Sequence, residues 1–385
     1  MAYLCAMNTY YDTLSEYDWE AVTKQIYASA PADVERALAK ERITMDDFAA
    51  LVSPAAEPYL KAMAEKSYRV TRRRFGNVIQ LYVPLYIANY CTNHCVYCGF
   101  SCRNQIKRTI LDEAAIRREA EAIRTKYKFQ HILLVTGEAP AKSSVEYIGR
   151  AIEIMREYFQ QVSIEVQPLE VSEYKYLMEK GLHSVYVYQE TYNEQRYPVY
   201  HPRGKKADYR YRLETGDRLG EAGVYKTGVG NLIGLEEWRT EAFFTALHVR
   251  YMENKYWRTK YSIAFPRLRP YAGEGAFQPN YPASERDLLQ LICAYRLASE
   301  DVELSVSTRE SAEYRDRIVP FGVTTMSAGS STMPGGYADQ DERELEQFAI
   351  NDDRSPAQVE AAIRAKGFEA VWKDWSLYLQ EACIG

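Results

Sequence analysis

The sequence predicts an α/β protein built as a closed (β/α)8 barrel of the TIM type, with a helical extension before the barrel and a second extension after it. Between residues 78 and 330, short runs of β-branched and aromatic residues alternate with longer helical patterns, as in a parallel sheet with crossover helices. About eight of these runs qualify as strands, and eight such units close a barrel. Polar side chains recur where the strands end, which is the edge on which barrels build their active sites.

Residues 1–77 form the helical N-terminal extension in this prediction. The clearest helical patterns cover residues 32–40, 44–51 and 58–74. Arg72, Arg73 and Arg74 close the last of them, where positive charge suits the helix dipole. We therefore interpret this run as a solvated helix face rather than as a site for an acidic partner.

Residues 78–330 form the predicted barrel. The helical patterns between its strands are clearest at residues 112–128, 144–159, 236–254 and 284–299, and the first opens on Asp112 as an N-cap. We expect the strands, in chain order, at residues 78–88, 131–136, 162–167, 184–190, 225–230, 262–266, 302–308 and 318–327.

Residues 331–385 form the C-terminal extension, which we expect to pack on or near the barrel. The stretch AGSSTMPGGYAD is rich in glycine, serine and proline, which predicts a mobile or ligand-contacting loop. A helix is expected at residues 355–366. Together these segments suggest a lid over the barrel.

Composition favours a small molecule or a protein as the partner, and the cytoplasm as the compartment. The 48 Lys and Arg residues against 53 Asp and Glu give a net charge of -5, which argues against nucleic acid bound through a basic field. The first residues show no signal-peptide pattern, and no stretch is long and apolar enough to span a bilayer. Seven cysteines are expected to stay reduced in that compartment.

The most informative feature is a cysteine triplet directly after the first predicted strand. Cys91, Cys95 and Cys98 follow a C-x3-C-x2-C spacing, so one loop carries all three sulfurs. Three thiolates can hold three irons of a 4Fe-4S cluster and leave the fourth iron open to a substrate. Structural zinc, completed by Cys102 or His94, is the main alternative, although zinc ligands usually come as two separated pairs.

Candidate functional residues lie at nearly every predicted strand end, which would place them around one barrel mouth. They include carboxylates, amides, hydroxyls and arginines. In chain order after the cysteine loop they are Gly137 and Glu138, Glu165 and Gln167, Gln189 and Glu190, Arg267 and Arg269, Ser307, Arg309 and Glu310, and Ser327.

The cysteine loop, with Tyr97 before its last cysteine, resembles the signature of the radical S-adenosylmethionine (SAM) superfamily. Further stretches are similar to the 2-iminoacetate synthase family, the tyrosine lyases of thiamine thiazole synthesis: PLYIANYCTNHCVYCGFS, LLVTGEAPAK, EVQPL, VYQETYNE, GVGNLIGL, FPRLRP, STRES, PGGYAD and VWKDW. The resemblance implies that the cluster binds SAM and cleaves it to a 5'-deoxyadenosyl radical. In the family, L-tyrosine then breaks between Cα and Cβ to give 2-iminoacetate and p-cresol.

The resemblance also implies roles for the SAM-binding residues. Arg212 is the candidate for the SAM carboxylate, with a surface ion pair as the equally weighted alternative. Gly230 and Ile233 resemble an adenine-contacting strand, although glycine there serves tight packing equally well. The remaining assignments are Tyr97 to the adenine, Gly137 and Glu138 to the methionyl amino group, and Glu165 with Gln167 to the ribose.

Tyrosine binding requires a cation for the α-carboxylate, because a buried carboxylate without a partner is costly and arginine can bind it bidentately. Arg309 is the best candidate, supported by Ser307 and Ser327. Arg267 and Arg269 compete for this role, with a structural ion pair as the other interpretation of one of them. Tyr86 is placed against the substrate amine or, alternatively, in the core, and Gln189 and Glu190 lie in the same mouth with open roles.

Partners and competing functions complete the hypothesis. The family implies thiazole synthase as a protein partner and a reductant such as flavodoxin or ferredoxin. A hydrogenase-maturation lyase would carry a second cluster on C-terminal cysteines, but only Cys383 follows residue 320. A tryptophan lyase and a zinc-binding scaffold without catalysis remain as alternatives. Cys102 is interpreted as incidental, since a fourth thiolate would block SAM.

Overall fold

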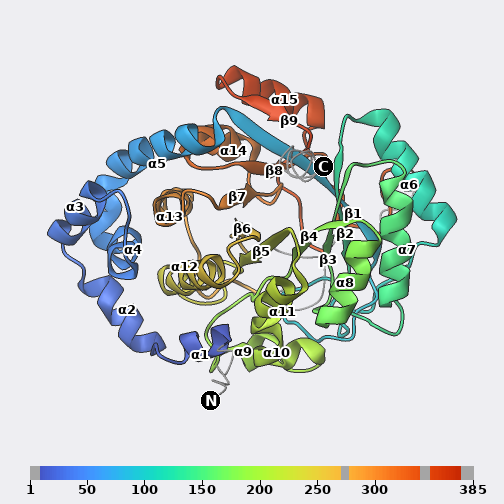
Figure 1. Ribbon diagram of the computed structural model, residues 1–385, viewed down its shortest axis with the longest axis horizontal. Coiled ribbons are helices and arrows are strands. Elements are labelled where there is room, and N and C mark those ends of the chain that lie inside the picture. Colours follow the sequence, from blue (N-terminus) through green and yellow to red (C-terminus); the bar gives the residue numbers. More distant parts are fainter. Residues whose placement is uncertain (1–8, 270–276, 339–346, 374–385) are drawn as a thin grey trace, which may run out of the picture.

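The structure is a computed structural model that describes residues 9–269, 277–338 and 347–373. At its centre, parallel strands follow one another in chain order, and β1 pairs with both β2 and β8, so that the sheet closes (Figure 1). The predicted (β/α)8 barrel is confirmed. Its strands are β1 (Val78–Ala88), β2 (His131–Thr136), β3 (Gln161–Glu165), β4 (Leu182–Tyr186), β5 (Lys226–Gly230), β6 (Lys260–Ala264), β7 (Glu303–Val306) and β8 (Thr325–Ser327).

Several predicted strands run past the observed ones, and the fourth and the eighth differ most. The segment predicted as a strand from residue 318 begins instead with the end of helix α14 (Ala312–Ile318), whose first turn Ser311 Oγ caps by accepting from the backbone N–H of Tyr314, 3.3 Å away. A short 3-10 turn, η3 (Val319–Phe321), follows before β8. The predicted strand 184–190 ends at Tyr186, and Glu190 has φ 71°, a left-handed conformation that no strand continues through.

The helices of the barrel cover the outside of the sheet (Figure 1). All four predicted helices are present within a few residues of the expected bounds, and Asp112 caps the first of them as expected. Helices between β3 and β5 were largely missed, since several are short. The helices are α6 (Glu113–Lys126), α7 (Val145–Arg156), α8 (Val171–Glu179), α9 (Tyr197–Tyr200), η2 (Lys205–Ala207), α10 (Tyr209–Leu213), α11 (Thr215–Ala222), α12 (Trp238–Lys255) and α13 (Glu285–Ala298).

The N-terminal helices form an arc against the outside of α12 and α13 (Figure 1). Trp19 stacks on Phe244 of α12 with ring centroids 5.3 Å apart, which anchors the arc. Arg73 and Arg74 pair with Glu300 and Asp301 at the surface, as the solvated-face interpretation expects. The arc consists of α1 (Tyr10–Leu14), α2 (Trp19–Ala28), α3 (Pro31–Ala39), α4 (Met45–Val52), η1 (Pro54–Tyr59) and α5 (Leu60–Phe75).

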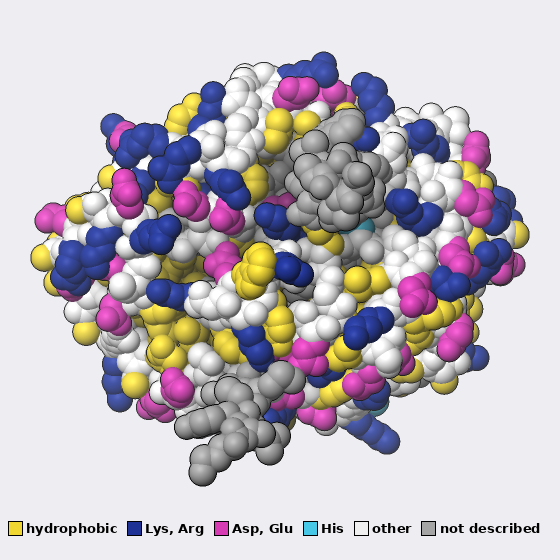
Figure 2. Space-filling model, viewed as in Figure 1, with side chains coloured by type: hydrophobic (Ala, Val, Ile, Leu, Met, Phe, Trp, Pro, Cys, Tyr) yellow, Lys and Arg dark blue, Asp and Glu magenta, His cyan; other side chains and the backbone are white. Residues whose placement is uncertain are grey.

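The C-terminal segment packs on the barrel through a strand that the sequence did not indicate. Strand β9 (Glu369–Val371) runs parallel to the first residues of β1, and α15 (Pro356–Ala365) lies beside it (Figure 1). Basic and acidic side chains intermingle over the visible face (Figure 2). None of the described helices combines the length and apolar character needed to cross a membrane.

Strand β1 organises the barrel interior. Alternate residues of a strand point to the same face, and Tyr82, Pro84 and Tyr86 line the cavity described below, whereas Gln80 bonds to His131 and Gln161 further down. Below the cavity, buried and partly buried polar side chains of different strands bond to one another. We call this set the lower polar layer: Gln80, His131, Gln161, His183, Lys226 and Glu303.

Candidate active site

A large cavity opens at the carboxyl ends of the strands, where the sequence places most candidate residues. Its wall combines inward-facing residues of β1, β2, β3, β4, β6, β7 and β8 with the cysteine loop. The predicted residues that line it are Tyr86, Cys91, Cys95, Tyr97, Cys98, Gly137, Glu138, Glu165, Glu190, Arg212, Ser307, Arg309 and Ser327, together with Glu310.

The cysteine loop is anchored by backbone hydrogen bonds to the segment that follows α9. The His94 N–H donates to the Arg203 carbonyl, 3.0 Å away, and the Val96 N–H donates to the Tyr200 carbonyl, 3.1 Å away. The loop turns all three thiols of the triplet toward the cavity, whereas Cys102 is exposed and does not line it. The placement matches three cluster ligands on one loop.

Burial raises the pKa of each thiol in the triplet. For Cys91 the pKa rises to about 11, through burial first and then the proximity of Cys98 and Glu138. Bare thiols here are therefore protonated, and bound iron would supply the positive charge that thiolates need. Within the described residues, no three Cys, His, Asp or Glu groups are placed to hold a metal ion together. Ligands of a cubane, which each bind a separate iron, need no such convergence.

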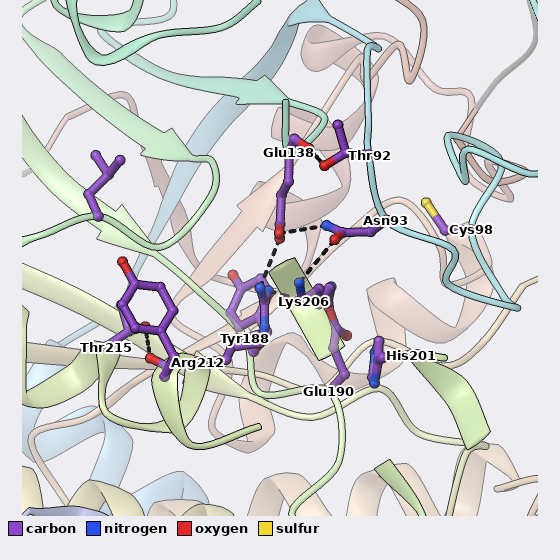
Figure 3. A network of polar contacts seen from close by, with 12 residues as sticks. Thr92, Asn93, Cys98, Glu138, Tyr188, Glu190, His201, Lys206, Arg212 and Thr215 are labelled. Carbon is purple, nitrogen blue, oxygen red and sulfur yellow. Dashed lines mark hydrogen bonds and ion pairs between the residues drawn. The ribbon is translucent and has the colours of Figure 1, made fainter. Parts of the chain in front are cut away.

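Glu138 is the centre of a buried ionic network beside the cysteine loop (Figure 3). It accepts from Arg212 Nη1 and from Asn93 Nδ2, each 2.8 Å away. Burial alone would raise its pKa, but Arg212 and Lys206 hold the pKa below its ordinary value, so Glu138 is ionised. Gly137 before it must lack a side chain, because a Cβ there would lie 2.3 Å from the Tyr90 carbonyl oxygen.

Lys206 and Glu190 form the second ion pair of this network, at 2.7 Å (Figure 3). The left-handed backbone of Glu190 turns its side chain into the cavity, which an extended residue would not do. Arg212 is buried rather than at the surface, and its Nε donates to the Tyr188 carbonyl, 2.6 Å away. The surface-pair interpretation of Arg212 is therefore wrong.

Tyr97 lies on the same side of the cavity. Its hydroxyl shares a 2.7 Å hydrogen bond with His201 Nε2, and the Lys206 ammonium lies 5.9 Å from its ring centroid. Burial lowers the pKa of His201 well below its usual range, so this imidazole is neutral. The ring of Tyr97 is thus fixed by its hydroxyl, which leaves an aromatic wall beside the cysteine loop.

Arg309 is a buried cation whose charge no described carboxylate balances through an ion pair. Its guanidinium carbon lies 3.4 Å from the centroid of the Phe348 ring. Stacking of this kind occupies the flat face of a guanidinium and leaves its in-plane N–H donors available to a carboxylate. Burial lowers the pKa of Arg309, against the nearby Tyr86 and Glu165. Ser307 Oγ accepts from the Arg309 backbone N–H, 3.4 Å away.

Among the charged residues that line the cavity, Glu165 also makes no hydrogen bond or ion pair with a described residue. It lines the cavity from the end of β3. Burial, reinforced by Glu190, raises its pKa to about 7 although Arg309 and Lys206 act in the opposite direction. Near neutral pH the Glu165 side chain can therefore either donate or accept.

Gln347, which the sequence did not single out, joins the cysteine loop to β1. Its Oε1 accepts from the Tyr86 hydroxyl, 2.7 Å away, and its Nε2 donates to Cys98 Sγ, 3.8 Å away. Its backbone carbonyl accepts from the Gly99 N–H, 3.1 Å away. The C-terminal segment thus contributes to the wall of the cavity.

Six predicted residues do not line the cavity and lie in other environments. Gln167 donates to the Ser143 carbonyl, and Gln189 lies buried toward α11 and α12. Both Arg267 and Arg269 pair with Glu310 instead of facing the cavity, which fits the structural-pair alternative. Gly230 packs so closely on β6 that a Cβ there would lie 2.0 Å from the Ala264 carbonyl oxygen. Ile233 does not line the cavity, whereas its neighbour Leu232 does.

The cavity also contains residues that sequence reasoning missed. Asn93 lies inside the cysteine motif itself and could have been found there, since it bonds both Glu138 and the backbone N–H of Lys206. Lys206 belongs to a turn without periodic pattern, and Gln347 and Phe348 follow an acidic stretch remote in sequence. Only the fold shows that these residues meet.

Comparisons with known proteins agree with this geometry. Residues 85–244 match the Radical SAM superfamily, and residues 264–369 match the Biotin and Thiamin Synthesis associated domain. The chain is similar to the 2-iminoacetate synthases of Escherichia coli (strain K12) and Salmonella typhimurium (strain LT2), with 49% and 47% identity over 98% of this chain and 99% of each relative. The crystal structure of HydG, a maturase of the FeFe-hydrogenase, superposes with a TM-score of 0.82 at 28% identity, covering 94% of this chain and 78% of that one.

Proposed function

Because this chain belongs to the 2-iminoacetate synthase family of radical SAM enzymes, we propose that the cavity described above binds SAM and L-tyrosine side by side. The enzyme is a radical SAM lyase. It cleaves L-tyrosine between Cα and Cβ to 2-iminoacetate and p-cresol, while SAM becomes methionine and 5'-deoxyadenosine, and it serves thiamine thiazole synthesis. One hydrogen of tyrosine passes to 5'-deoxyadenosine, and an electron and a proton replace it in p-cresol, so the two products keep all the carbon, nitrogen and oxygen atoms of tyrosine.

The donor set at the cysteine loop fits a 4Fe-4S cluster with one open iron. Cys91, Cys95 and Cys98 would hold three irons, and exposed Cys102 stays outside the cavity. With SAM on the open iron, the cluster supplies a 5'-deoxyadenosyl radical by one-electron cleavage. One observation carries this proposal: three sulfurs on one loop line the same cavity as the Arg309 guanidinium, which lacks a carboxylate partner among the described residues.

The residues around the loop suit the polar groups of SAM. Ionised Glu138 can accept from the methionyl amine, while Arg212 and Lys206 offer the positive charge that the methionyl carboxylate requires. Tyr97 offers its ring to the adenine, and Glu165 offers hydrogen-bonding capacity to the ribose. Each of these groups is largely shielded from water, so its hydrogen bonds and charge interactions with SAM are stronger than they would be in water.

Tyrosine would occupy the β1, β7 and β8 side of the cavity. Arg309 binds the α-carboxylate through its in-plane donors while Phe348 holds the guanidinium plane. Tyr86, held by Gln347 beside Cys98, lies between this carboxylate site and the cluster. In this arrangement the substrate amino group lies toward the cysteine loop, and the aromatic ring extends into the barrel.

The cellular setting follows from the chemistry. A one-electron donor such as flavodoxin or ferredoxin would reduce the cluster, and thiazole synthase would take up 2-iminoacetate before water hydrolyses it. We place the enzyme in the cytoplasm, since three thiols and an oxidisable cluster persist in a reducing compartment.

Anaerobic turnover tests the function. The cluster is reconstituted, SAM, reductant and L-tyrosine are added, and p-cresol, glyoxylate from hydrolysed 2-iminoacetate, and 5'-deoxyadenosine are quantified by mass spectrometry. We expect p-cresol to depend on tyrosine. Deoxyadenosine without p-cresol would exclude tyrosine as the substrate, and replacement of tyrosine by tryptophan would then test the indole alternative.

A further inference from the structure

Two hydroxyl groups face each other at the floor of the cavity, and none of the roles above uses them. The Tyr82 hydroxyl on β1 and Ser305 Oγ on β7 lie 3.5 Å apart, and both residues line the cavity. The separation is at the long limit for a hydrogen bond between hydroxyls. Since each hydroxyl can donate once and accept twice, both retain capacity for a further partner.

The position of this pair along the strands makes it the floor. Tyr82 lies two residues above Gln80 of the lower polar layer on the same face of β1, and its ring lies 5.8 Å from that of His131. Tyr86, at the level of the cysteine loop, is four residues further on, a distance of about 13 Å along an extended strand. Ser305 lies within β7, whereas Arg309 follows four residues later in the turn beyond the end of that strand. We expect the space between the two levels to admit an aromatic side chain.

The wall between these levels is largely apolar. Pro84, Leu133, Val135 and Val306 line it, so the hydroxyl pair is a polar spot at the end of an apolar channel. Ser327 lies beside Tyr82 in register, its Oγ accepts from the Thr308 N–H, 3.1 Å away, and its side chain also interacts with the Tyr82 hydroxyl. Ser327 thus supports Tyr82 from the side, while Tyr82 and Ser305 face each other across the floor.

We propose that Tyr82 and Ser305 bind the phenol hydroxyl of the substrate and thereby select tyrosine over phenylalanine. This inference rests on the proposed function, with the α-carboxylate at Arg309. A phenol oxygen between the two hydroxyls donates to one and accepts from the other. Phenylalanine in the same place would leave both buried hydroxyls without that partner, which is how sites built for a hydroxyl reject the analogue that lacks one.

The assignment is tested by removing the hydroxyl either from the substrate or from the protein. Affinities of L-tyrosine and L-phenylalanine are measured by calorimetry on cluster-loaded enzyme with SAM and without reductant, for wild type, Tyr82→Phe and Ser305→Ala. We expect each variant to lose about 10-fold in tyrosine affinity and to bind phenylalanine within about 2-fold of wild type. Ser305→Thr, which keeps a hydroxyl, should retain most of the tyrosine affinity.

Two results would contradict the phenol site. Unchanged tyrosine affinity in both variants, or an equal loss for tyrosine and phenylalanine, would overturn the assignment. Iron content and the SAM affinity of each variant show whether the cluster end is intact. Production of p-cresol by wild type separates the two hypotheses: its absence contradicts the lyase function, whereas its presence with unchanged variant affinities contradicts the phenol site alone.

Discussion

The barrel interior holds two buried polar layers that differ in how completely their groups are paired. In the lower polar layer, Lys226 and Glu303 lie 2.6 Å apart, and the Gln80 amide bonds both His131 and Gln161. At the mouth, Arg309 stacks on a phenyl ring and Glu165 makes no hydrogen bond or ion pair with a described residue. Both layers contain charged side chains from β3, β5 and β7 or from the loops that follow these strands.

The comparison teaches that polarity by itself does not mark a binding site. Charges paired with each other inside a barrel serve the fold, because either partner alone would be costly to bury. Charges whose remaining donors and acceptors face a cavity are held ready for a ligand by the rest of the structure. The following variants separate the two layers, from the largest expected effect to the smallest.

Replacing a cysteine of the triplet should abolish activity while leaving the fold intact. Cys95→Ser removes the ligand of one iron, so we expect loss of the cluster and of p-cresol, measured by iron and sulfide analysis and by mass spectrometry. Cys293→Ala is the matched control, since Cys293 is buried between α13 and the chain near Phe321, away from the cavity. A Cys95→Ser protein with full iron content and turnover would contradict the cluster assignment.

Breaking the lower polar layer should cost stability. Lys226 is 1% exposed, and Lys226→Met leaves Glu303 without its cation, so the free energy of unfolding should fall by about 3–5 kcal/mol. Arg73→Met breaks an exposed pair with Glu300 and should cost less than about 1 kcal/mol. Urea unfolding compares the two variants, and equal losses would show that the lower layer is no more important than a surface pair.

Glu165 gives the free energy of unfolding a pH dependence that originates at the mouth of the barrel. Its pKa in the folded protein, about 7, lies above the ordinary 4.5, because burial and then Glu190 disfavour the charge. Its contribution to stability is therefore complete below pH 4.5 and is lost as the pH rises through 7. Relative to Glu165→Gln, the unfolding free energy of the wild-type apoprotein should decline by about 3 kcal/mol over this interval. A constant difference between the two proteins would remove Glu165 as the cause.

The choice between the candidate arginines is open to a smaller but more specific test. Arg309→Lys loses the bidentate donors, and the tyrosine KM should rise about 10-fold while SAM affinity stays constant. Arg267→Lys, a matched change at the pair with Glu310, should alter the tyrosine KM less than about 2-fold. Turnover kinetics measure both, and an unchanged KM and kcat in Arg309→Lys would exclude Arg309 from the substrate site.

Much of the fold was predictable because the barrel repeats one simple pattern. Strands β1 and β2 are runs rich in apolar residues, and their bounds were predicted correctly. The largest errors have local causes. The fourth predicted strand ran on to Glu190, which is left-handed, and the eighth included the end of helix α14 and the 3-10 turn after it. Neither feature has a distinctive hydrophobic period.

The site was predictable where chemistry is concentrated in a short motif, as in the cysteine loop with Gly137 and Glu138. It was not predictable where the direction of a side chain decides. Arg267 and Arg309 both follow strand ends, yet Glu310 pairs with one and not with the other. Gln189 and Glu190 are adjacent, but only Glu190 turns into the cavity. Sequence separation also hid Gln347, which reaches Cys98 only through the folded C-terminal segment.

Strand β1 sets a strict limit on how this chain can change in length. Inward-facing positions 80, 82, 84 and 86 place, in turn, the lower polar layer, the cavity floor, the apolar channel and the support beside the cysteine loop. A single residue inserted or deleted within this run would exchange its inner and outer faces beyond that point. Substitutions in β1 can therefore be graded in their effects, whereas a one-residue change of length would disconnect the floor from the mouth at once.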